Sequence, residues 1–591
     1  MNQRRSFKRF YLLLFLLVLL IATAAPQKDE KITPRLLNVI KERGSHGSYK
    51  AWIYFRDKDL YSHQRSKEPE KDLHLRSLER RLRHGFTSLM DEHDLPVHKP
   101  YIEIVRQFVT KVRHTSRWLN AVSVEAKGLE LERIAKFHFV QKVDKVLVFT
   151  YREPAPKFLA QLDVVPLEAK AHILDYGPSF NQNDQLNVPL LHDMGYSGKG
   201  ILICMLDSGF NNLTHQALDH LDIIATWDFV NGDPNVFDEN GQMGNGNHGT
   251  RTLGTIAGFE PGELVGPAFG ASFILGKTEN TDWERHIEED HWIAGAEWAD
   301  SMGADIISSS LGYRDQFTHG ESDYFWENLD GKTTVVAKGA NIAASRGILI
   351  INSAGNEGLS SPPENTLVSP SDSPRVLAAG AVNSQGDRVN FSSTGPTADG
   401  RIKPDVMARG LDVYTANPDD PEQYDLVDGT SFSCPLTAGV AALILEINPS
   451  WTNEDVMDVM KLTASRSDSP DNLFGWGILD AYEAAFYVLK DLHAPNDFAI
   501  KRLENHYGFF IQYVDQLSWA SNPKNGNRVQ SYRIYAKKLD IQGRPFELIA
   551  EVDNETHSLI RRGLLGDETF LYKITSVSHT GEESDPQYAR Q

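Results

Sequence analysis

The apolar positions between about residues 185 and 490 form short runs without polar interruption, and helical stretches separate these runs. The clearest runs cover residues 201–206, 306–311, 348–352 and 376–382, and the helical stretches include residues 292–302 and 334–346. A strand that is apolar on both faces is buried on both faces. The pattern therefore predicts an α/β fold, a parallel sheet with helices on both faces, in which ligands bind at the carboxyl ends of the strands.

The residues before this region, from about 48 to 150, show a different alternation. Strand patterns occur at residues 51–55, 119–124 and 140–149, which predicts a small α+β unit. An apolar stripe at helical spacing lies between the first two strands and consists of Leu75, Leu78, Leu82, Phe86 and Leu89. Such spacing predicts an amphipathic helix.

The last hundred residues change pattern again. Short strand patterns at residues 509–513, 532–536, 546–552 and 570–577 are separated by turn residues, a spacing expected for a β-sandwich. We expect Trp519 and Tyr572 to lie in the core of this sandwich.

The chain begins with the pattern of a signal peptide. Arg4, Arg5, Lys8 and Arg9 precede an apolar run over residues 10–21, which closes on Ala22-Thr23-Ala24. The alternative is a membrane anchor, but the run is shorter than the roughly 20 residues that span a bilayer. We therefore expect a protein that is secreted, extracellular or periplasmic, with no membrane contact once the signal is removed. Together with the three patterns above, the signal peptide divides the chain into residues 1–24, 25–160, 175–490 and 492–591.

Charge and cysteine content narrow the function classes. The chain carries a formal net charge of −20, yet residues 26–155 hold an excess of about eight positive charges. The remainder is strongly acidic, which argues against nucleic acid as a partner and suggests that the basic and acidic parts meet. Cys204 and Cys434 lie in apolar surroundings, and two buried free thiols are favoured over a disulfide bridge.

Three residues of the middle region combine the parts of a nucleophilic site. Asp207 follows the buried strand predicted at 201–206, where a carboxylate needs a partner. His248 opens a stretch of small residues that predicts a helix, and Ser431 stands where an apolar helix begins, with Pro435 expected in its first turn. Taken singly, a histidine such as His248 is usually structural, and a serine such as Ser431 is commonly a helix cap. Together they offer a nucleophile, a base and a group that orients the base.

Short motifs around these residues resemble the signatures of the subtilisin family of serine peptidases. The motifs are Asp207-Ser208-Gly209, His248-Gly249-Thr250, Gly429-Thr430-Ser431 with Ser433 and Pro435, Ser310-Leu311-Gly312, and residues 353–358. The resemblance covers about 300 residues. It implies a secreted serine endopeptidase that forms an acyl-enzyme with Asp207, His248 and Ser431 as its triad.

The same resemblance assigns the remaining roles. It implies that Asn356 is the side-chain oxyanion donor, and that extended polypeptide substrates pair with two strand edges. The residues of these edges are Ser310, Leu311, Gly312, Ala354 and Gly355. Residues 49–150 resemble the propeptide of this family, so the leader is expected to be an intramolecular inhibitor of a zymogen that processes itself.

Three features leave the details of the site open. Arg251 stands where many relatives carry histidine, and Tyr324, Phe325 and Trp326 lie in an aromatic segment that either rims the cleft or packs an insertion. No cofactor is needed for the chemistry and no metal ligand is assigned. An acidic loop nevertheless carries oxygen ligands suited to calcium, or is simply solvated, and contains Asp228, Asn231, Asp233, Asp238, Glu239 and Asn240.

Two other functions compete with a peptidase. One is a catalytically silent binding protein that works through its C-terminal module, where Trp519, residues 532–535 and residues 572–577 resemble a fibronectin type III module. The other is an esterase with the same triad. The complete set of catalytic residues argues against the first, and the strand-edge motifs favour peptide substrates over the second.

Overall fold

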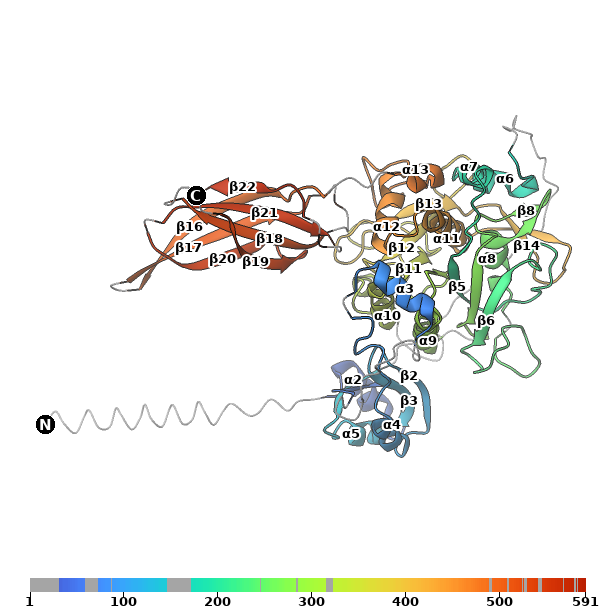
Figure 1. Ribbon diagram of the computed structural model, residues 1–591. Coiled ribbons are helices and arrows are strands. Elements are labelled where there is room, and N and C mark those ends of the chain that lie inside the picture. Colours follow the sequence, from blue (N-terminus) through green and yellow to red (C-terminus); the bar gives the residue numbers. More distant parts are fainter. Residues whose placement is uncertain are drawn as a thin grey trace. The chain divides into compact units, whose positions relative to one another are not determined.

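The computed structural model describes residues 31–58, 73–145, 172–487 and 492–590, apart from short gaps at 87, 245, 283–284, 315–322, 508–509, 523–524, 526–528, 540–544, 567, 579–580 and 582. The predicted signal peptide and the end of the strand predicted at 140–149 lie outside these residues. The chain divides into two compact units, one of residues 1–64 and 93–146 and the other of residues 65–92 and 147–591 (Figure 1).

The first unit is built on a four-stranded antiparallel sheet in the order β2-β3-β1-β4. Its elements are α2 (Pro34–Arg43), β1 (Ser48–Phe55), α4 (Lys99–Arg106), β2 (Lys111–Ser116), β3 (Ala121–Lys127), α5 (Gly128–Ile134) and β4 (Val140–Lys145). Ile53 of the central strand pairs with Val122 on one side and with Val143 on the other, and all three side chains are completely buried. The alternation of apolar residues in the sequence thus forms the core of this unit.

The second unit contains a seven-stranded sheet in the order β13-β12-β11-β10-β5-β9-β6. Its strands are β5 (Leu202–Asp207), β6 (Asp222–Asp228), β9 (Ser272–Lys277), β10 (Ile306–Ser309), β11 (Leu349–Ser353), β12 (Val376–Val382) and β13 (Val406–Arg409). Every neighbouring pair is parallel. The predicted α/β fold is confirmed, because fully buried strands require cover on both faces of the sheet.

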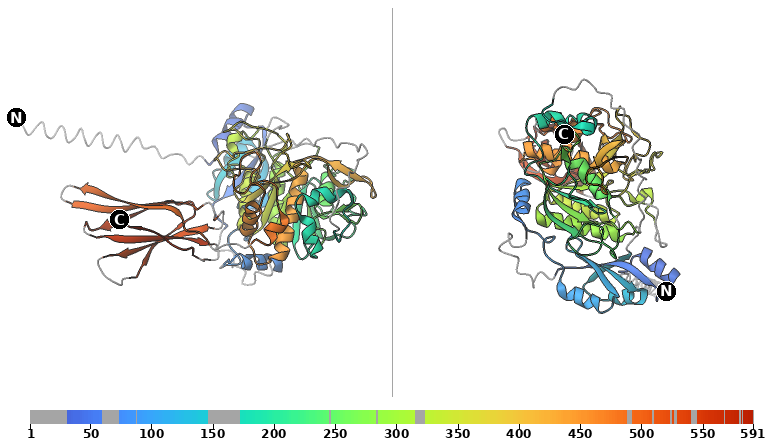
Figure 2. Two further views of the ribbon diagram at one scale, coloured as in Figure 1. Left: turned by 90° about the horizontal axis from the view of Figure 1, so that it is seen from above. Right: turned by 90° about the vertical axis from the view of Figure 1, so that its right-hand side faces the viewer.

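Helices supply that cover. α8 (His248–Ala257) packs on α11 (Thr430–Ile447), and α9 (Ile287–Met302) packs on α10 (Val335–Ser345), so that two helical layers enclose the sheet (Figure 2). α11 is the one helix among the described residues that is long and apolar enough to cross a membrane. Because 89% of its apolar window is buried, its apolar character is that of a core helix.

Shorter elements complete the second unit. They are η2 (Gly177–Ser179), α6 (Phe180–Asp184), α7 (Val188–Asp193), β7 (Phe259–Glu260), β8 (Leu264–Val265), η3 (Trp326–Asn328), β14 (Val413–Ala416), β15 (Tyr424–Val427), α12 (Asn453–Leu462) and α13 (Ala481–Ala485).

The register of the sheet brings distant parts of the chain to one edge. Ser309 pairs with Leu206 of β5 and with Asn352 of β11. The residues that follow these pairs are therefore level with one another at the carboxyl edge, where Asp207 ends β5 and Ser310 follows β10. This is the edge at which open α/β sheets place their sites.

Helix α3 (Leu75–Arg83) corrects the prediction of a leucine-faced helix. The helix ends at Arg83, before Phe86 and Leu89, and Leu75 and Leu82 are 62% and 60% exposed. Arg80 and Arg81 are buried instead. The helix packs against α9, within the second unit, so its buried face is set by charged partners that a hydrophobic pattern does not reveal.

The C-terminal residues form two antiparallel sheets, in the orders β16-β17-β20 and β19-β18-β21-β22. The strands are β16 (Asn496–Tyr507), β17 (Phe510–Ala520), β18 (Val529–Lys538), β19 (Glu547–Asp553), β20 (Ser558–Leu564), β21 (Phe570–Ser578) and β22 (Gln587–Arg590). Trp519 and Tyr572 lie in the single core that both sheets share, as expected. Tyr572 also donates a hydrogen bond of 2.6 Å to Asp515, which satisfies its buried hydroxyl.

Candidate active site

Asp207 and His248 form a buried pair at the carboxyl edge of the sheet. Nδ1 of His248 lies 2.7 Å from Oδ1 of Asp207. The same carboxylate accepts hydrogen bonds from the backbone N–H of Ser208 at 2.8 Å and from the hydroxyl of Thr252 at 2.9 Å. An ionised carboxylate only accepts, so Nδ1 of His248 carries the proton and Nε2 is left with a lone pair. A neutral imidazole in this tautomer can remove a proton from a nucleophile.

Ser431 is the second residue of α11, and the ring of Phe432, next to it, lies 5.6 Å from the ring of His248. The histidine and the serine are therefore neighbours, although they are 183 positions apart in the sequence. The amides of the first helical turn lack intrahelical acceptors, and the helix dipole places positive potential there. The site thus has backbone donors beside its nucleophile.

The sequence predicts Pro435 in the first turn of α11, but the structure places it in the helix interior. A proline there has no N–H for the carbonyl four residues earlier, which is the carbonyl of Ser431. The hydroxyl of Ser310 takes over that role and donates to the Ser431 carbonyl at 2.7 Å. The residue after β10 therefore fixes the backbone that carries the serine.

Asn356 is oriented by Thr430. Its Oδ1 accepts hydrogen bonds from the backbone N–H and from the hydroxyl of Thr430, each at 2.9 Å. The amide nitrogen is thereby turned away from Thr430, and a Cβ built on Gly429 would lie 3.6 Å from it. Gly429 has a φ of +145°, where a residue with a side chain is strained. The glycine leaves the space in front of the Asn356 amide open.

The two predicted substrate edges differ in how much of their main chain is already used. The carbonyl of Leu311 accepts from the Asn352 side chain at 2.8 Å, that of Ala354 from Val368 N–H at 3.2 Å, and that of Gly355 from Ser393 N–H at 3.0 Å. These three carbonyls are engaged inside the domain. Ser310 and Gly312 flank the engaged carbonyl of Leu311 on either side, and the Ser310 carbonyl lies 3.5 Å from the hydroxyl of Ser431.

A buried carboxyl group lies close to this site. Burial raises the pKa of Glu279 to about 8, with a smaller contribution from the charge of Asp207, and Glu279 accepts a hydrogen bond of 2.6 Å from the Tyr313 hydroxyl. Tyr313 is completely buried, and Tyr324 is buried as well and bonds to Glu289 at 3.0 Å. Phe325, in contrast, is 70% exposed. Of the two alternatives for the aromatic segment, packing of an insertion holds for Tyr324, which is buried, but not for Phe325, which is exposed.

Arg251 and the cysteines have structural partners. Arg251 donates to Asp425 of β15 at 2.9 Å and to the side chain of Asn247 at 3.0 Å. Cys204 and Cys434 are free and completely buried, as expected. Burial raises the pKa of both thiols, to about 12 for Cys434, so neither is a thiolate at neutral pH.

The acidic loop after β6 is held by protein donors. Asp228 accepts hydrogen bonds from Val230 and Asn231, and the completely buried ammonium of Lys277 lies 3.4 Å from its Oδ2. Asp233 is bonded to Gln242, and Asp238 to the amide of Gly246. Among the residues that the structure describes, no cluster of three metal-ligating side chains occurs, and Lys277 provides a fixed positive charge inside this loop.

Two supporting residues escaped the sequence analysis. Thr252 shares the Asp207 carboxylate with His248, and Thr430 orients Asn356. Thr252 stands four positions after His248 on α8, on the same helical face, so the spacing carried a usable signal. Thr430 belongs to the motif Gly429-Thr430-Ser431, but its contact with Asn356 joins residues 74 positions apart and follows only from the fold.

Comparisons with known proteins identify the family of this chain. Residues 198–477 match the model of the subtilase family, and residues 50–157 match the peptidase S8 propeptide domain of Bacteroidota. Subtilisin E of Bacillus subtilis (strain 168) is 31% identical over 61% of this chain and 86% of its own length, and subtilisin of Bacillus pumilus is 33% identical over 51% and 96%. A crystal structure of MycP1 with the N-terminal propeptide removed shares 22% identity, covers 52% of this chain and 97% of that chain, and gives a TM-score of 0.42. The chain therefore belongs to the subtilase family and is a serine endopeptidase made as a zymogen.

Proposed function

We propose that Asp207, His248 and Ser431 form the catalytic triad of this peptidase. The observation that carries the proposal is the 2.7 Å contact between Asp207 and His248 beside the start of α11. In this scheme His248 takes the proton of Ser431 as its oxygen attacks the peptide carbonyl, and returns that proton to the leaving amine. Asp207 keeps the imidazole in the tautomer that its hydrogen bond already selects, and stabilises the imidazolium.

The oxyanion of the tetrahedral intermediate would be held by two donors. One is the amide nitrogen of Asn356, whose oxygen Thr430 holds. The other is the backbone N–H of Ser431 in the first turn of α11. Donors that are already oriented cost no reorganisation when the negative charge develops, which is why such groups lower the barrier.

The substrate would be an extended polypeptide bound mainly through its main chain. The carbonyl of Leu311 is already bonded inside the domain, so we assign the pairing at this edge to Ser310 and Gly312. Both positions follow the end of β10, and residues two apart in an extended segment point their main-chain polar groups to the same side. Because main-chain pairing reads no side chains, we expect broad sequence tolerance.

The proposed organisation is a signal peptide over residues 1–24, a propeptide over 25–160, a catalytic domain over 175–490 and a C-terminal module over 492–591. The enzyme would be secreted and would cut its own leader. The C-terminal module would be of the fibronectin type III kind, since its three-stranded and four-stranded antiparallel sheets enclose one core.

The test compares Ser431→Ala with the unaltered chain. The variant should lose casein hydrolysis and fluorophosphonate labelling, and should accumulate with its leader attached, while its circular dichroism and secretion stay unchanged. Ser345→Ala, on the surface of α10, is the matched control and should behave like the parent. Casein hydrolysis by Ser431→Ala above a trace would contradict the triad. Labelling of the parent without casein hydrolysis would favour an esterase.

A further inference from the structure

Among the residues of the leader that the structure describes, the segment around α3 clusters with the compact unit of the catalytic domain. The family model places it within the propeptide, between residues 50 and 157, yet residues 65–92 cluster with the second unit. In Figure 1 the blue ribbon of α3 lies among the green and yellow elements of that unit, and it contacts α9. Its backbone is bonded there as well, since His74 N–H donates to the carbonyl of Ser301 at 3.0 Å.

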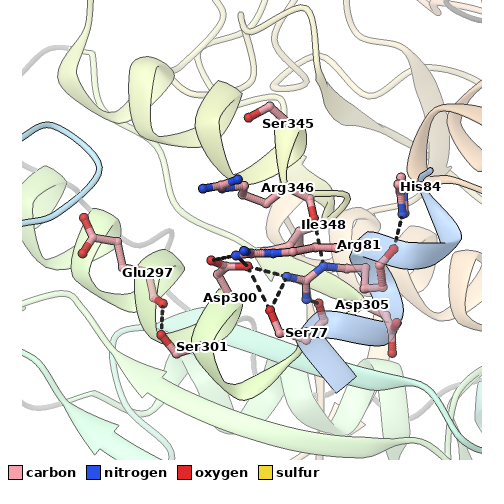
Figure 3. Close-up of polar contacts among 12 residues, drawn as sticks. Ser77, Arg81, His84, Glu297, Asp300, Ser301, Asp305, Ser345, Arg346 and Ile348 are labelled. Carbon is pink, nitrogen blue, oxygen red and sulfur yellow. Dashed lines mark hydrogen bonds and ion pairs between the residues drawn. The ribbon is translucent and has the colours of Figure 1, made fainter. Parts of the chain in front are cut away.

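Asp300, near the end of α9, receives two guanidinium groups from α3. Arg80 donates to its Oδ1, and Arg81 donates to its Oδ2 at 2.9 Å (Figure 3). The hydroxyl of Ser77 lies 3.5 Å from Oδ1. The side chains of Asp300, Arg80 and Arg81 are at most 1% exposed. Three ionised groups are therefore removed from water together, and the carboxylate is compensated by charges that come from the leader.

Asp305, just before β10, repeats the arrangement at the rim. Arg76 donates to one of its oxygens at 2.7 Å and Arg83 to the other at 2.9 Å. The arginines of α3 also reach backbone carbonyls: Arg76 that of Gly200, Arg80 those of Ala304 and Arg346, and Arg83 that of Pro449. A guanidinium carries five donors in a fixed fork, so these contacts define the position and direction of α3.

Two glycines on the surface that contacts α3 leave room for the α3 segment to approach closely. Gly303 ends α9 with a φ of +83°, and a Cβ built on it would lie 2.5 Å from Cβ of Arg76 and 2.7 Å from the backbone nitrogen of Ser77. A Cβ on Gly347, after α10, would lie 2.7 Å from the ring of His84. A glycine thus follows the end of each of these two helices, at a point where a side chain would collide with α3 or with His84, which follows it.

This interface lies at the opposite edge of the sheet from the proposed triad. Asp305 precedes the first residue of β10, and Ser310 follows the last. At about 3.3 Å per residue, the five steps between them span roughly 16 Å. An occupant of the α3 surface therefore does not block the serine.

We propose that α3 is an anchor that binds the leader to the catalytic domain through Asp300 and Asp305, separately from the substrate cleft, and holds the leader there after the chain has been cut. The inference rests on the proposed removal of the leader. The buried residues of α3 are Ser77, Arg80, Arg81 and a single leucine, Leu78, so a released α3 exposes mainly polar side chains to water, which suits a contact that has to form and later separate. Release would uncover Asp300 and Asp305 as a new acidic surface of the mature enzyme.

The experiment cuts the leader without using the enzyme's own activity. The full chain with Ser431→Ala receives a recognition sequence for an added protease between residues 147 and 171. After the cut, the time course of leader loss is followed by size-exclusion chromatography. The leader should stay bound, and Arg80→Met with Arg81→Met should release it at least about 100-fold faster, because Asp300 then loses both compensating charges. Since the cut is external, a failure of self-processing does not affect the result.

The control removes the same two charges from exposed positions of the leader, Arg43→Met with Arg106→Met, and should keep the slow release of the parent. Immediate loss of the leader from the parent, or equal release by both double variants, would overturn the anchor. Hydrogen exchange of residues 75–83 in the parent needs no substitution. Protection that survives the cut supports the anchor, and protection that collapses on cutting refutes it.

Discussion

Asp207 and Asp300 are both buried carboxylates of the catalytic unit, yet they are supported in different ways. Asp207 receives its hydrogen bonds from Ser208, His248 and Thr252, which all lie within 45 positions of it. Asp300 receives them from Arg80 and Arg81, about 220 positions earlier in the leader. On the proposed removal of the leader, Asp207 would therefore keep these partners, whereas Asp300 would lose the guanidinium groups of Arg80 and Arg81.

One domain can therefore support its proposed catalytic residues by itself, while another of its buried carboxylates depends on the leader. A buried charge without a partner is costly, so each carboxylate needs a donor in every state in which it remains buried. For Asp207 the donors are built into β5 and α8, and the proposed catalytic geometry is independent of processing. For Asp300 the donors belong to α3, so its hydrogen bonds from Arg80 and Arg81 exist only while α3 is docked.

The largest effect should come from breaking the Asp207 side of this comparison. With asparagine at 207, His248 is held in the wrong tautomer, and kcat should fall by about 10⁴-fold. The leader of Asp207→Asn, once cut by an added protease, should be retained as firmly as that of the parent. The measurements are kcat on a peptide substrate and the release rate. A loss of less than tenfold would remove Asp207 from the proposed triad, and faster release of the leader would show that the two carboxylates are not independent.

The second effect concerns Asn356, which the same fold orients without help from the leader. Asn356→Leu should reduce kcat by about 100-fold to 1000-fold with little change in KM, the magnitude known for a subtilisin oxyanion donor rather than one derived from the geometry of this chain. Thr430→Val, which removes one of the two bonds that hold the Asn356 oxygen, should lower kcat by less. A change confined to KM would assign Asn356 to substrate binding instead.

The sheet was predictable from the sequence because several of its strands are apolar runs without polar interruption. Val376–Val382 is apolar throughout and forms β12 with the bounds that the pattern gives. The positions of Asp207 and Ser310 at the carboxyl edge then follow from the parallel topology. Helix α3 was not predictable in the same way, because two of its three leucines, Leu75 and Leu82, are exposed, and its buried arginines form ion pairs whose partners lie far away in the sequence.

The contacts that depend on a missing backbone group were equally hidden. Pro435 is visible in the sequence, but the carbonyl that it leaves without a donor belongs to Ser431, and Ser310 satisfies it from 121 positions away. Periodicity predicts which face of an element is buried. It does not predict which hydroxyl reaches a single unsatisfied carbonyl.

The third effect tests that hydroxyl. Ser310→Ala should lower the free energy of unfolding by about 2 kcal/mol, because a buried carbonyl is left without its donor while the neighbouring proline still offers none. Urea unfolding in the Ser431→Ala background, which prevents self-digestion, measures the change. Ser345→Ala serves as the control and should change the free energy by less than about 0.5 kcal/mol. Equal stability of the two variants would mean that the Ser431 carbonyl finds another donor.

The smallest effect sharpens the comparison from the side of α3. Burial lowers the pKa of His84 to about 4, so the docked ring is neutral: its Nδ1–H donates to the Arg80 carbonyl at 2.8 Å, and its Nε2 accepts from the backbone N–H of Asn453 at 3.1 Å. Other charged groups near the ring are Arg83 on α3 and, lining the same cavity, Arg375 and Glu454. A histidine whose pKa is depressed on docking contributes stability that is complete above about 6.5 and is lost as the pH falls toward 4.

Leader release from the cut Ser431→Ala protein should therefore be about 20-fold faster at pH 5 than at pH 7, since protonation of His84 favours the undocked helix. Asp300 and Asp305 are each paired with two arginines of α3. His84→Asn can still bond to both partners but cannot titrate, so its release rate should be nearly the same at the two pH values. The dependence on pH, rather than the absolute rate, is the readout, because the substitution also alters the contact. A variant that keeps the full acceleration at pH 5 would place the titrating group elsewhere and leave His84 with a packing role only.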